Sequence, residues 1–418
     1  MNIFILIAGL LIYSGYGLTG LIYLISVVLL TYYLALLIPK HPRFMWLSVG
    51  ANVLLLCAVK LQPLTGMNIP AIMGVSYISF QVISYTVDVW RGKYAPERNL
   101  LRYSLFVTYL PHVFIGPIER YDHFRETAFH KRRISWDDLS AGCARILWGA
   151  FKKLVIASRA GVVVAAVSGD PEAYRGAYAL FALLMYSIQI YADFSGGIDM
   201  VLGVSRMLGI RLSENFDVPY FSQSVQEFWR RWHITLGSWL KDYVYIPLGG
   251  NRRGKMRKYL NLIITFLVSG LWHGFSYVLW GLLNGIFVCV GEKLKTKFAI
   301  VNRAGTFIVI SFLWAFFVWP DGMTALRQAA SVFTVFNYAG LAASVLQLGL
   351  EASEWIVLLA ATLLLWLYDM HKEKLSRGYA ALAPAMRVAV MCVMALTLLV
   401  FGMYGIGFDA EEFIYSRF

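Results

Sequence analysis

Long apolar runs, separated by short clusters of Lys and Arg, make up most of this chain. No charged residue stands between Met1 and Pro39, which is room for one long spanning helix and part of another. Further apolar runs long enough to cross or enter a bilayer are Phe44–Val59, Ile69–Trp90, Tyr178–Tyr191, Gly197–Leu208, Tyr259–Trp272, Phe275–Val290, Thr306–Trp319, Trp355–Tyr368 and Val388–Met403, with a weaker one at Leu326–Leu350. The pattern predicts an all-α polytopic membrane protein with about ten or eleven transmembrane helices.

Three segments depart from the simple spanning pattern. Leu105–Ile118 is apolar but contains Pro111 and Pro117, so we expect a bent or re-entrant piece. The first half of Leu139–Val167 carries three basic residues, which predicts an amphipathic helix that lies at the membrane interface and then becomes a span. Ser222–Leu240 is too polar to span, and its aromatic residues recur near helical spacing, which favours an amphipathic helix.

Composition supports the membrane assignment and narrows the function. The chain has 418 residues, of which 59% are hydrophobic and 15% charged, whereas soluble domains carry roughly 25% charged residues. The net charge of +13 does not indicate nucleic-acid binding, because no recognised binding module accompanies it. Lys and Arg instead gather in loops, where they set membrane topology. The four cysteines are scattered and form no CxxC pair, so their spacing indicates no metal site.

Two histidines that each follow a tryptophan are the main candidates for chemistry. His273 lies in a run without charge from Tyr259 to Gly291, and a titratable group in such a run usually faces a cavity or pathway. His233 lies in the polar segment Ser222–Leu240, which either rests on the membrane surface or points this histidine into a central cavity. We favour the surface interpretation from the residues alone.

Two acidic residues and one basic turn also have two interpretations each. Asp193 and Asp199 stand beside Ser195 and two glycines, which permit close helix approach or a break. They are either structural hydrogen-bond partners, which we favour, or they line a cavity. Asn251–Lys258 is strongly basic, and it either sets topology only, which we favour, or also faces the phosphates of an acyl donor.

The region from Tyr191 to Gly285 resembles the membrane-bound O-acyltransferase (MBOAT) family, in particular its bacterial branch of alginate O-acetylation proteins. The matching motifs are YADFSG, ENF-x-x-P-Y, FWRRWHITL-x-x-W, L-x-D-Y-x-Y-I-P-L-G-G-N-R and GLWHG-x-x-x-x-x-x-W-G, with lighter matches in SYISFQVISYTVDVWRG and GPIERY. The resemblance implies one integral-membrane domain over residues 1–418 with its motif core at 191–285. It also implies a helical bundle with re-entrant and interfacial helices around a central cavity.

The resemblance also implies a reaction and assigns roles to the two histidines. Transfer of an acyl group from a thioester to a hydroxyl requires removal of the hydroxyl proton, a task for which histidine is suited. We expect His273 to be the general base, with His233 in the same reaction chamber supporting the donor or the acceptor. The expected donor is acetyl-CoA, without a permanently bound cofactor. The expected product is O-acetylated polysaccharide outside the bacterial cytoplasmic (inner) membrane, in which the chain would sit among lipids.

The C-terminal sequence EEFIYSRF is similar to the Phe-Ile-Tyr ending of related bacterial transferases. In that wider group the tyrosine is a candidate acyl relay to an extracytoplasmic SGNH-type transferase, which implies a relay role for Tyr415 and such an enzyme as partner. The final residues, Tyr-Ser-Arg-Phe, depart from the more usual Tyr-Phe-Gln-Phe. The alternative is an aromatic anchor at the membrane interface.

Two other functions remain open at this point. One is D-alanyl transfer to teichoic acid from a carrier-protein thioester. The other is a transporter without catalytic activity, in which buried histidines line a pathway. Covalent serine catalysis is not expected, because the sequence contains no G-x-S-x-G motif.

Overall fold

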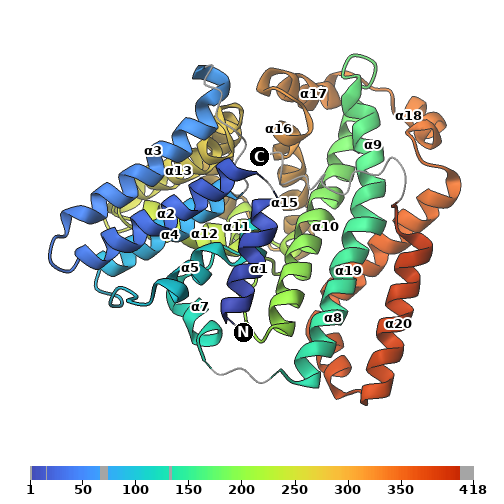
Figure 1. Ribbon diagram of the computed structural model, residues 1–418. Helices are drawn as coiled ribbons and strands as arrows, with labels where there is room; N and C mark the ends of the chain where they lie inside the picture. Colours follow the sequence, from blue (N-terminus) through green and yellow to red (C-terminus); the bar gives the residue numbers. More distant parts are fainter. Residues whose placement is uncertain (1, 16, 66–73, 131–133, 405–418) are drawn as a thin grey trace.

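The computed structural model describes residues 2–15, 17–65, 74–130 and 134–404, and these form helices joined by short connections (Figure 1). The N-terminal helices are α1 (Asn2–Ser14), α2 (Leu18–Leu37), α3 (Arg43–Thr65), α4 (Val75–Trp90), α5 (Leu100–Thr108), α6 (Leu110–Phe114) and α7 (Tyr121–Ala128). Next come α8 (Trp136–Phe151), the π-helix η1 (Lys152–Ala157), α9 (Ser158–Gly169) and α10 (Ala177–Met207).

The second half of the described chain contains many short helices and three of 18 residues or more, α13, α19 and α20. They are η2 (Pro219–Phe221), α11 (Val225–Arg231), α12 (Ile234–Leu240), η3 (Lys241–Tyr245), α13 (Gly254–His273), η4 (Phe275–Tyr277), α14 (Val278–Gly291), η5 (Glu292–Leu294), α15 (Ala299–Leu313), α16 (Ala315–Val318), α17 (Gly322–Thr334), α18 (Tyr338–Ser344), η6 (Val345–Gln347), α19 (Ala352–Ala381) and α20 (Pro384–Phe401). Figure 1 shows α2, α3, α4 and α13 on the left and α8, α9, α10, α19 and α20 on the right, with α11 and α12 between. The predicted all-α fold of a multi-pass membrane protein is confirmed.

Six helical segments among the described residues are long and apolar enough to cross a membrane by themselves. They are Leu18–Leu37, Arg43–Lys60, Ala177–Met207, Ala299–Val318, Ala352–Ala381 and Pro384–Phe401. The pair Gly322–Thr334 and Tyr338–Gln347, bent by 106°, gives a seventh if it counts as one span. The remaining apolar helices are shorter, so the predicted total of about ten or eleven spans stays a prediction. The single domain over residues 1–418 stays a prediction as well.

Helix α10 is one continuous element of 31 residues, so the two separate segments predicted over Tyr178–Leu208 are wrong. Its glycines permit close packing against α8 instead of a break. A Cβ on Gly196 would lie 2.7 Å from the carbonyl oxygen of Gly149, and one on Gly203 would lie 2.6 Å from that of Gly142. Both distances are too short for any other residue. Small residues at these two levels therefore set the spacing of the helices.

The segment that we predicted to lie at the interface packs along α10 as well. Helices α8, η1 and α9 form a nearly continuous run from Trp136 to Gly169, with the π-helix in its middle. Lys152 and Lys153, at the start of η1, are buried. The interfacial prediction is wrong for these charges, because they pair with acidic residues of α10 inside the bundle.

The break at Gly274 produces a hairpin. Helix α13 ends at His273, and Gly274 follows with φ 142°, a value that favours glycine. A Cβ on Gly285 of α14 would lie 2.9 Å from the Cα of Ile263, and one on Gly281 would lie 3.3 Å from the Cα of Gly270. The chain thus returns alongside itself. The apolar runs Tyr259–Trp272 and Phe275–Val290 allow either one long tilted helix or two halves that break at His273-Gly274, and the structure has the break. His273 stands at the turn.

The predicted bend in Leu105–Ile118 is confirmed. Helix α5 ends at Thr108, and Tyr109 adopts an extended conformation (φ −60°, ψ 106°). Pro111 then stands in the first turn of α6, where its missing N–H costs no helical hydrogen bond. The short α6 packs between α4 and α10, which brings this segment into the interior.

Candidate active site

The segment Ser222–Leu240 is not one helix, because it breaks at His233. This residue has φ 46° and ψ 55°, the left-handed conformation that costs a residue other than glycine free energy. Trp232 just before it forms an isolated antiparallel bridge with Phe216. Phe228, Trp232 and His233 are all buried, so the prediction of a helix on the membrane surface is wrong.

Asn215 holds the turn at His233. Its carbonyl oxygen accepts a hydrogen bond from the N–H of Ile234 at 3.0 Å. Its side-chain oxygen accepts from the N–H of Thr235 at 3.0 Å and from the Thr235 hydroxyl at 2.7 Å. The Nδ1 atom of His233 lies 3.4 Å from the same oxygen. One buried amide therefore fixes both the backbone and the ring of this histidine.

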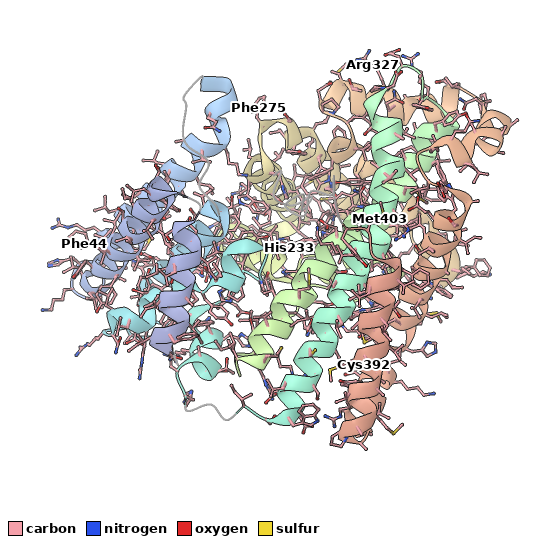
Figure 2. All side chains as sticks on the ribbon, turned by 45° about the vertical axis from the view of Figure 1, so that its right-hand side comes forward. Phe44, His233, Phe275, Arg327, Cys392 and Met403 are labelled. Carbon is pink, nitrogen blue, oxygen red and sulfur yellow. The ribbon has the colours of Figure 1, made fainter. Side chains whose placement is uncertain are left out.

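His233 and His273 are brought into the same part of the interior. The ring of His233 is edge-on to Phe194 at 4.9 Å, and Figure 2 shows this histidine deep between the two groups of helices. The ring of His273 lies 4.4 Å from Trp272, 5.4 Å from Trp280 and 5.5 Å from Phe317. The ring of Trp314 lies 5.2 Å from Trp232, the neighbour of His233, and 5.6 Å from Phe317, so both histidines border one aromatic cluster. The central cavity around them stays a prediction.

A third buried histidine, His112 of α6, was missed by the sequence reasoning. It is fully buried, and its Nδ1 lies 2.8 Å from the Nε2 of Gln81. The signal was present, since no charged residue stands between Tyr103 and Ile118. The same argument that selected His273 would have selected His112.

A hydrogen-bonded path joins the short α6–α7 connection to the turn at His233. The N–H of Ile118 donates to the Thr235 hydroxyl at 3.0 Å. Glu119, buried beside it, accepts from the N–H of Ser213 and, at 2.8 Å, from the Nδ1 of His123. His123 stands in the most charged stretch of the sequence, ERYDHFRETAFHKRR, which favours a solvated loop residue. The structure instead pairs it with Glu119 while 44% of its side chain remains exposed.

The pair of His123 and Glu119 should make stability depend on pH. The hydrogen bond that His123 donates to the Glu119 carboxylate raises the pKa of His123 above its ordinary value of 6.5. A raised histidine pKa adds stability below pH 6.5, and this contribution is lost as pH rises through the folded-state pKa. We expect His123→Gln to lower the melting temperature at pH 6 by more than at pH 8.5. Thermal unfolding of both proteins at both pH values checks this, and an equal gap would contradict it.

The basic residues of α8 and η1 are paired with acids. Lys153 forms an ion pair with Asp193 at 2.7 Å. Asp199 accepts from Lys152 at 2.6 Å and from Arg145 at 2.8 Å. The guanidinium of Arg145 also binds both carboxylate oxygens of Glu214, and the Lys152 ammonium donates to Ser195. The favoured structural interpretation of Asp193 and Asp199 is thus supported by their contacts.

Removal of the Asn215 amide should destabilise the protein measurably. Asn215→Ala would leave the buried donors of Thr235 without their acceptor, a loss of about 1–3 kcal/mol in the free energy of unfolding. The matched control is Asn302→Ala, which removes an acceptor from an exposed loop at Thr296. Denaturant or thermal unfolding of the two variants tests the expectation. Equal losses would show that Asn215 does not hold the turn.

Tyr415, the candidate acyl relay, lies outside the described residues, so its role stays a prediction. The two histidines form the candidate site together with Asn215 as the residue that positions His233. Their roles are proposals, which are argued below.

Comparison with known proteins identifies the family. The model of the MBOAT, membrane-bound O-acyltransferase family matches residues 66–331. The chain is 35% identical to the "Probable alginate O-acetylase AlgI" of Pseudomonas fluorescens over 351 residues, which cover 80% of this chain and 70% of that protein. It is 29% identical to the "Peptidoglycan O-acetyltransferase" of Helicobacter pylori, over 85% of this chain and 77% of that one. It is 27% identical to the "Teichoic acid D-alanyltransferase" of Bacillus subtilis, over 75% of this chain and 87% of that one.

The match covers more than half of the chain and includes both histidines, the turn at His233 and the hairpin. It confirms the resemblance seen in the motifs, and it sets aside the alternative of a transporter without catalytic activity. The chain therefore belongs to the membrane-bound O-acyltransferase family and is an O-acyltransferase.

Proposed function

We propose that this enzyme transfers an acetyl group from acetyl-CoA to a hydroxyl of an extracytoplasmic polysaccharide. The observation that carries this proposal is the position of His273, buried among aromatic rings at the turn of the α13–α14 hairpin. The named activities of the relatives support the acetyl group and the polysaccharide. Identity is higher with the alginate O-acetylase (35%) than with the D-alanyltransferase (27%).

His273 is proposed as the general base. In the reaction the acceptor oxygen attacks the thioester carbonyl, a C–O bond forms and the C–S bond breaks. The proton of the hydroxyl passes to the imidazole of His273 and then to the departing thiolate, so the enzyme ends unchanged. The aromatic rings around His273 keep water away from the thioester, which suppresses its hydrolysis.

His233 is proposed to support the reactants beside the base. The negative charge that develops on the thioester oxygen requires a donor placed in advance. The Asn215 amide and the left-handed turn fix the position of His233, so the imidazole or a neighbouring backbone N–H can meet that oxygen without reorganisation. This role explains why a conformation with a free-energy cost is retained.

The distribution of charge supports an orientation in the membrane. Asp242 accepts hydrogen bonds from Arg91 through its carbonyl and from Arg120 through its carboxylate. Two basic stretches of the sequence therefore meet at η3, which leads into the basic turn Asn251–Lys258. Basic segments mark the cytoplasmic side. We assign the side that carries η3 to the cytoplasm of a bacterium and the protein to its inner membrane, with acetyl-CoA entering here.

An extracytoplasmic SGNH-type transferase is the proposed partner that completes acetylation, with Tyr415 as the acyl relay. If Tyr415 carries the acetyl group, mass spectrometry of the C-terminal peptide should find it acetylated when the acceptor is withheld. Tyr415→Phe is the control. A peptide that stays unmodified under these conditions would contradict the relay and favour an interfacial anchor.

The function is tested by the esters on the cell surface. A deletion strain is complemented with the wild-type gene or an empty vector, and acids released by mild base are measured. Acetate that depends on the gene supports the proposal. D-alanine that depends on it would instead assign the chain to the D-alanylation branch, and no change in either ester would contradict the proposal.

A further inference from the structure

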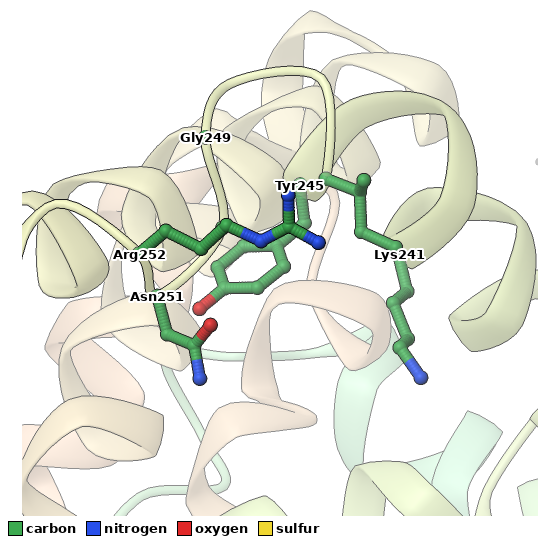
Figure 3. A pocket seen from close by; sticks show the side chains of 7 residues that line it. Lys241, Tyr245, Gly249, Asn251 and Arg252 are labelled. Carbon is green, nitrogen blue, oxygen red and sulfur yellow. The ribbon is translucent and has the colours of Figure 1, made fainter.

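A pocket of about 300 Å³ opens on the surface beside η3, away from the two histidines. Its lining combines two cations, one amide, one phenol, one aliphatic side chain and two glycines. The residues are Lys241, Tyr245, Ile246, Gly249, Gly250, Asn251 and Arg252. Figure 3 shows the side chains of Arg252, Asn251 and Tyr245 gathered on one side and that of Lys241 on the other. No acidic side chain is among the described residues that line it.

The backbone of the loop that forms the pocket is fixed by two glycines and by hydrogen bonds. Gly249 and Gly250 have φ values of 105° and 56°, which only glycine adopts without strain. The buried side chain of Asn261 donates to the carbonyl oxygen of Gly250 at 2.8 Å. The N–H of Gly250 donates to the carbonyl of Tyr245 at 3.0 Å. The cations are therefore presented on a fixed backbone.

The neighbouring carboxylate does not neutralise these cations. Asp242 follows Lys241 in the sequence, but its carboxylate accepts from Arg120 at 3.4 Å. A site with two positive charges, an amide and a hydroxyl is matched to an anion with several acceptor oxygens, of which phosphate is the commonest biological example.

We infer that this pocket binds a phosphate group of the soluble thioester donor. The inference rests on the proposed function, since it names where the CoA part of the donor is held. The pocket also adjoins both elements that lead to the histidines. The seven residues of α12 separate His233 from Lys241, a rise of about 12 Å from the one to the other. Helix α13, which starts directly after the loop, ends at His273. A donor anchored here has its flexible arm directed along these helices.

The test measures acetyl-CoA binding and transfer with the full chain in neutral phosphatidylcholine nanodiscs. Arg252→Gln and Lys241→Gln are each expected to weaken CoA binding and raise the KM for acetyl-CoA about fivefold, with kcat nearly unchanged. The matched control, Lys255→Gln, removes an exposed cation of the same basic segment that does not line the pocket. Its KM should stay at the wild-type value.

Three results would overturn the inference. One is an unchanged KM in both pocket variants while the wild type transfers acetyl, which leaves the proposed function standing. Another is an equal effect of Lys255→Gln, which would indicate general attraction by the basic surface. The third is loss of co-purified phosphatidylglycerol in Arg252→Gln with CoA binding intact, which would assign the pocket to a lipid headgroup. A wild type that binds CoA through this pocket but transfers no acetyl would contradict the proposed function alone.

Discussion

His273→Ala should lower acetyl transfer by about 10²–10⁴-fold, the usual contribution of a general base, without preventing folding. The imidazole packs against three aromatic rings. Its removal takes away the proton acceptor, while the hairpin retains its glycine contacts. The measurement is the rate of acetyl transfer from acetyl-CoA at saturating donor, using equal amounts of folded protein. The KM for acetyl-CoA should change little, because the proposed donor pocket is formed by other residues.

The control for this experiment is His371→Ala, which removes an exposed histidine of α19. It should leave the rate unchanged. If His273→Ala transfers acetyl at the wild-type rate while its melting temperature and elution from a sizing column are normal, the assignment of the base is wrong. If His273→Ala yields less folded protein but the folded protein transfers acetyl at the wild-type rate, His273 has a structural role alone.

Much of this site followed from the local sequence, because a histidine in a charge-free run is costly and therefore informative. His273 was found in that way, between the apolar runs Tyr259–Trp272 and Phe275–Val290. The direction of the turn was not predictable. It depends on contacts of Gly281 and Gly285 with the preceding helix, and the local pattern of apolar residues carries no information about contacts between two helices.

His233 shows the opposite case, in which periodicity misled. The aromatic residues of Ser222–Leu240 recur near helical spacing, yet the chain turns at His233 because Asn215 and Phe216 bind there. A partner about eighteen residues away competes successfully with helix propensity, which is a weak preference. The basic residues of α8 and η1 likewise led to a wrong prediction, that of a helix at the membrane interface. An unpaired Lys is expected at the interface, and only the packing against α10 shows that Lys153 has Asp193 opposite it.

The loss of either partner of the Lys153–Asp193 pair should be among the most destabilising single changes in the bundle. The two side chains are only 10% and 4% exposed and their charged atoms lie 2.7 Å apart. Lys153→Met leaves Asp193 buried without this partner, and Asp193→Leu does the same to Lys153. Each change should cost about 3–5 kcal/mol of unfolding free energy, because the remaining charge keeps its desolvation penalty.

The double variant Lys153→Met with Asp193→Leu separates this explanation from simple loss of packing. It removes both charges, so it should recover most of the stability that either single change loses. The exposed pair of Arg175 and Glu172, with side chains 43% and 71% exposed, is the matched control, and Glu172→Gln there should cost at most about 1 kcal/mol. Unfolding of all four variants in one detergent gives the coupling energy. If the double variant is as unstable as the sum of the singles, the pair does not act as a pair, and the glycine contacts between α8 and α10 would be what holds the two helices together.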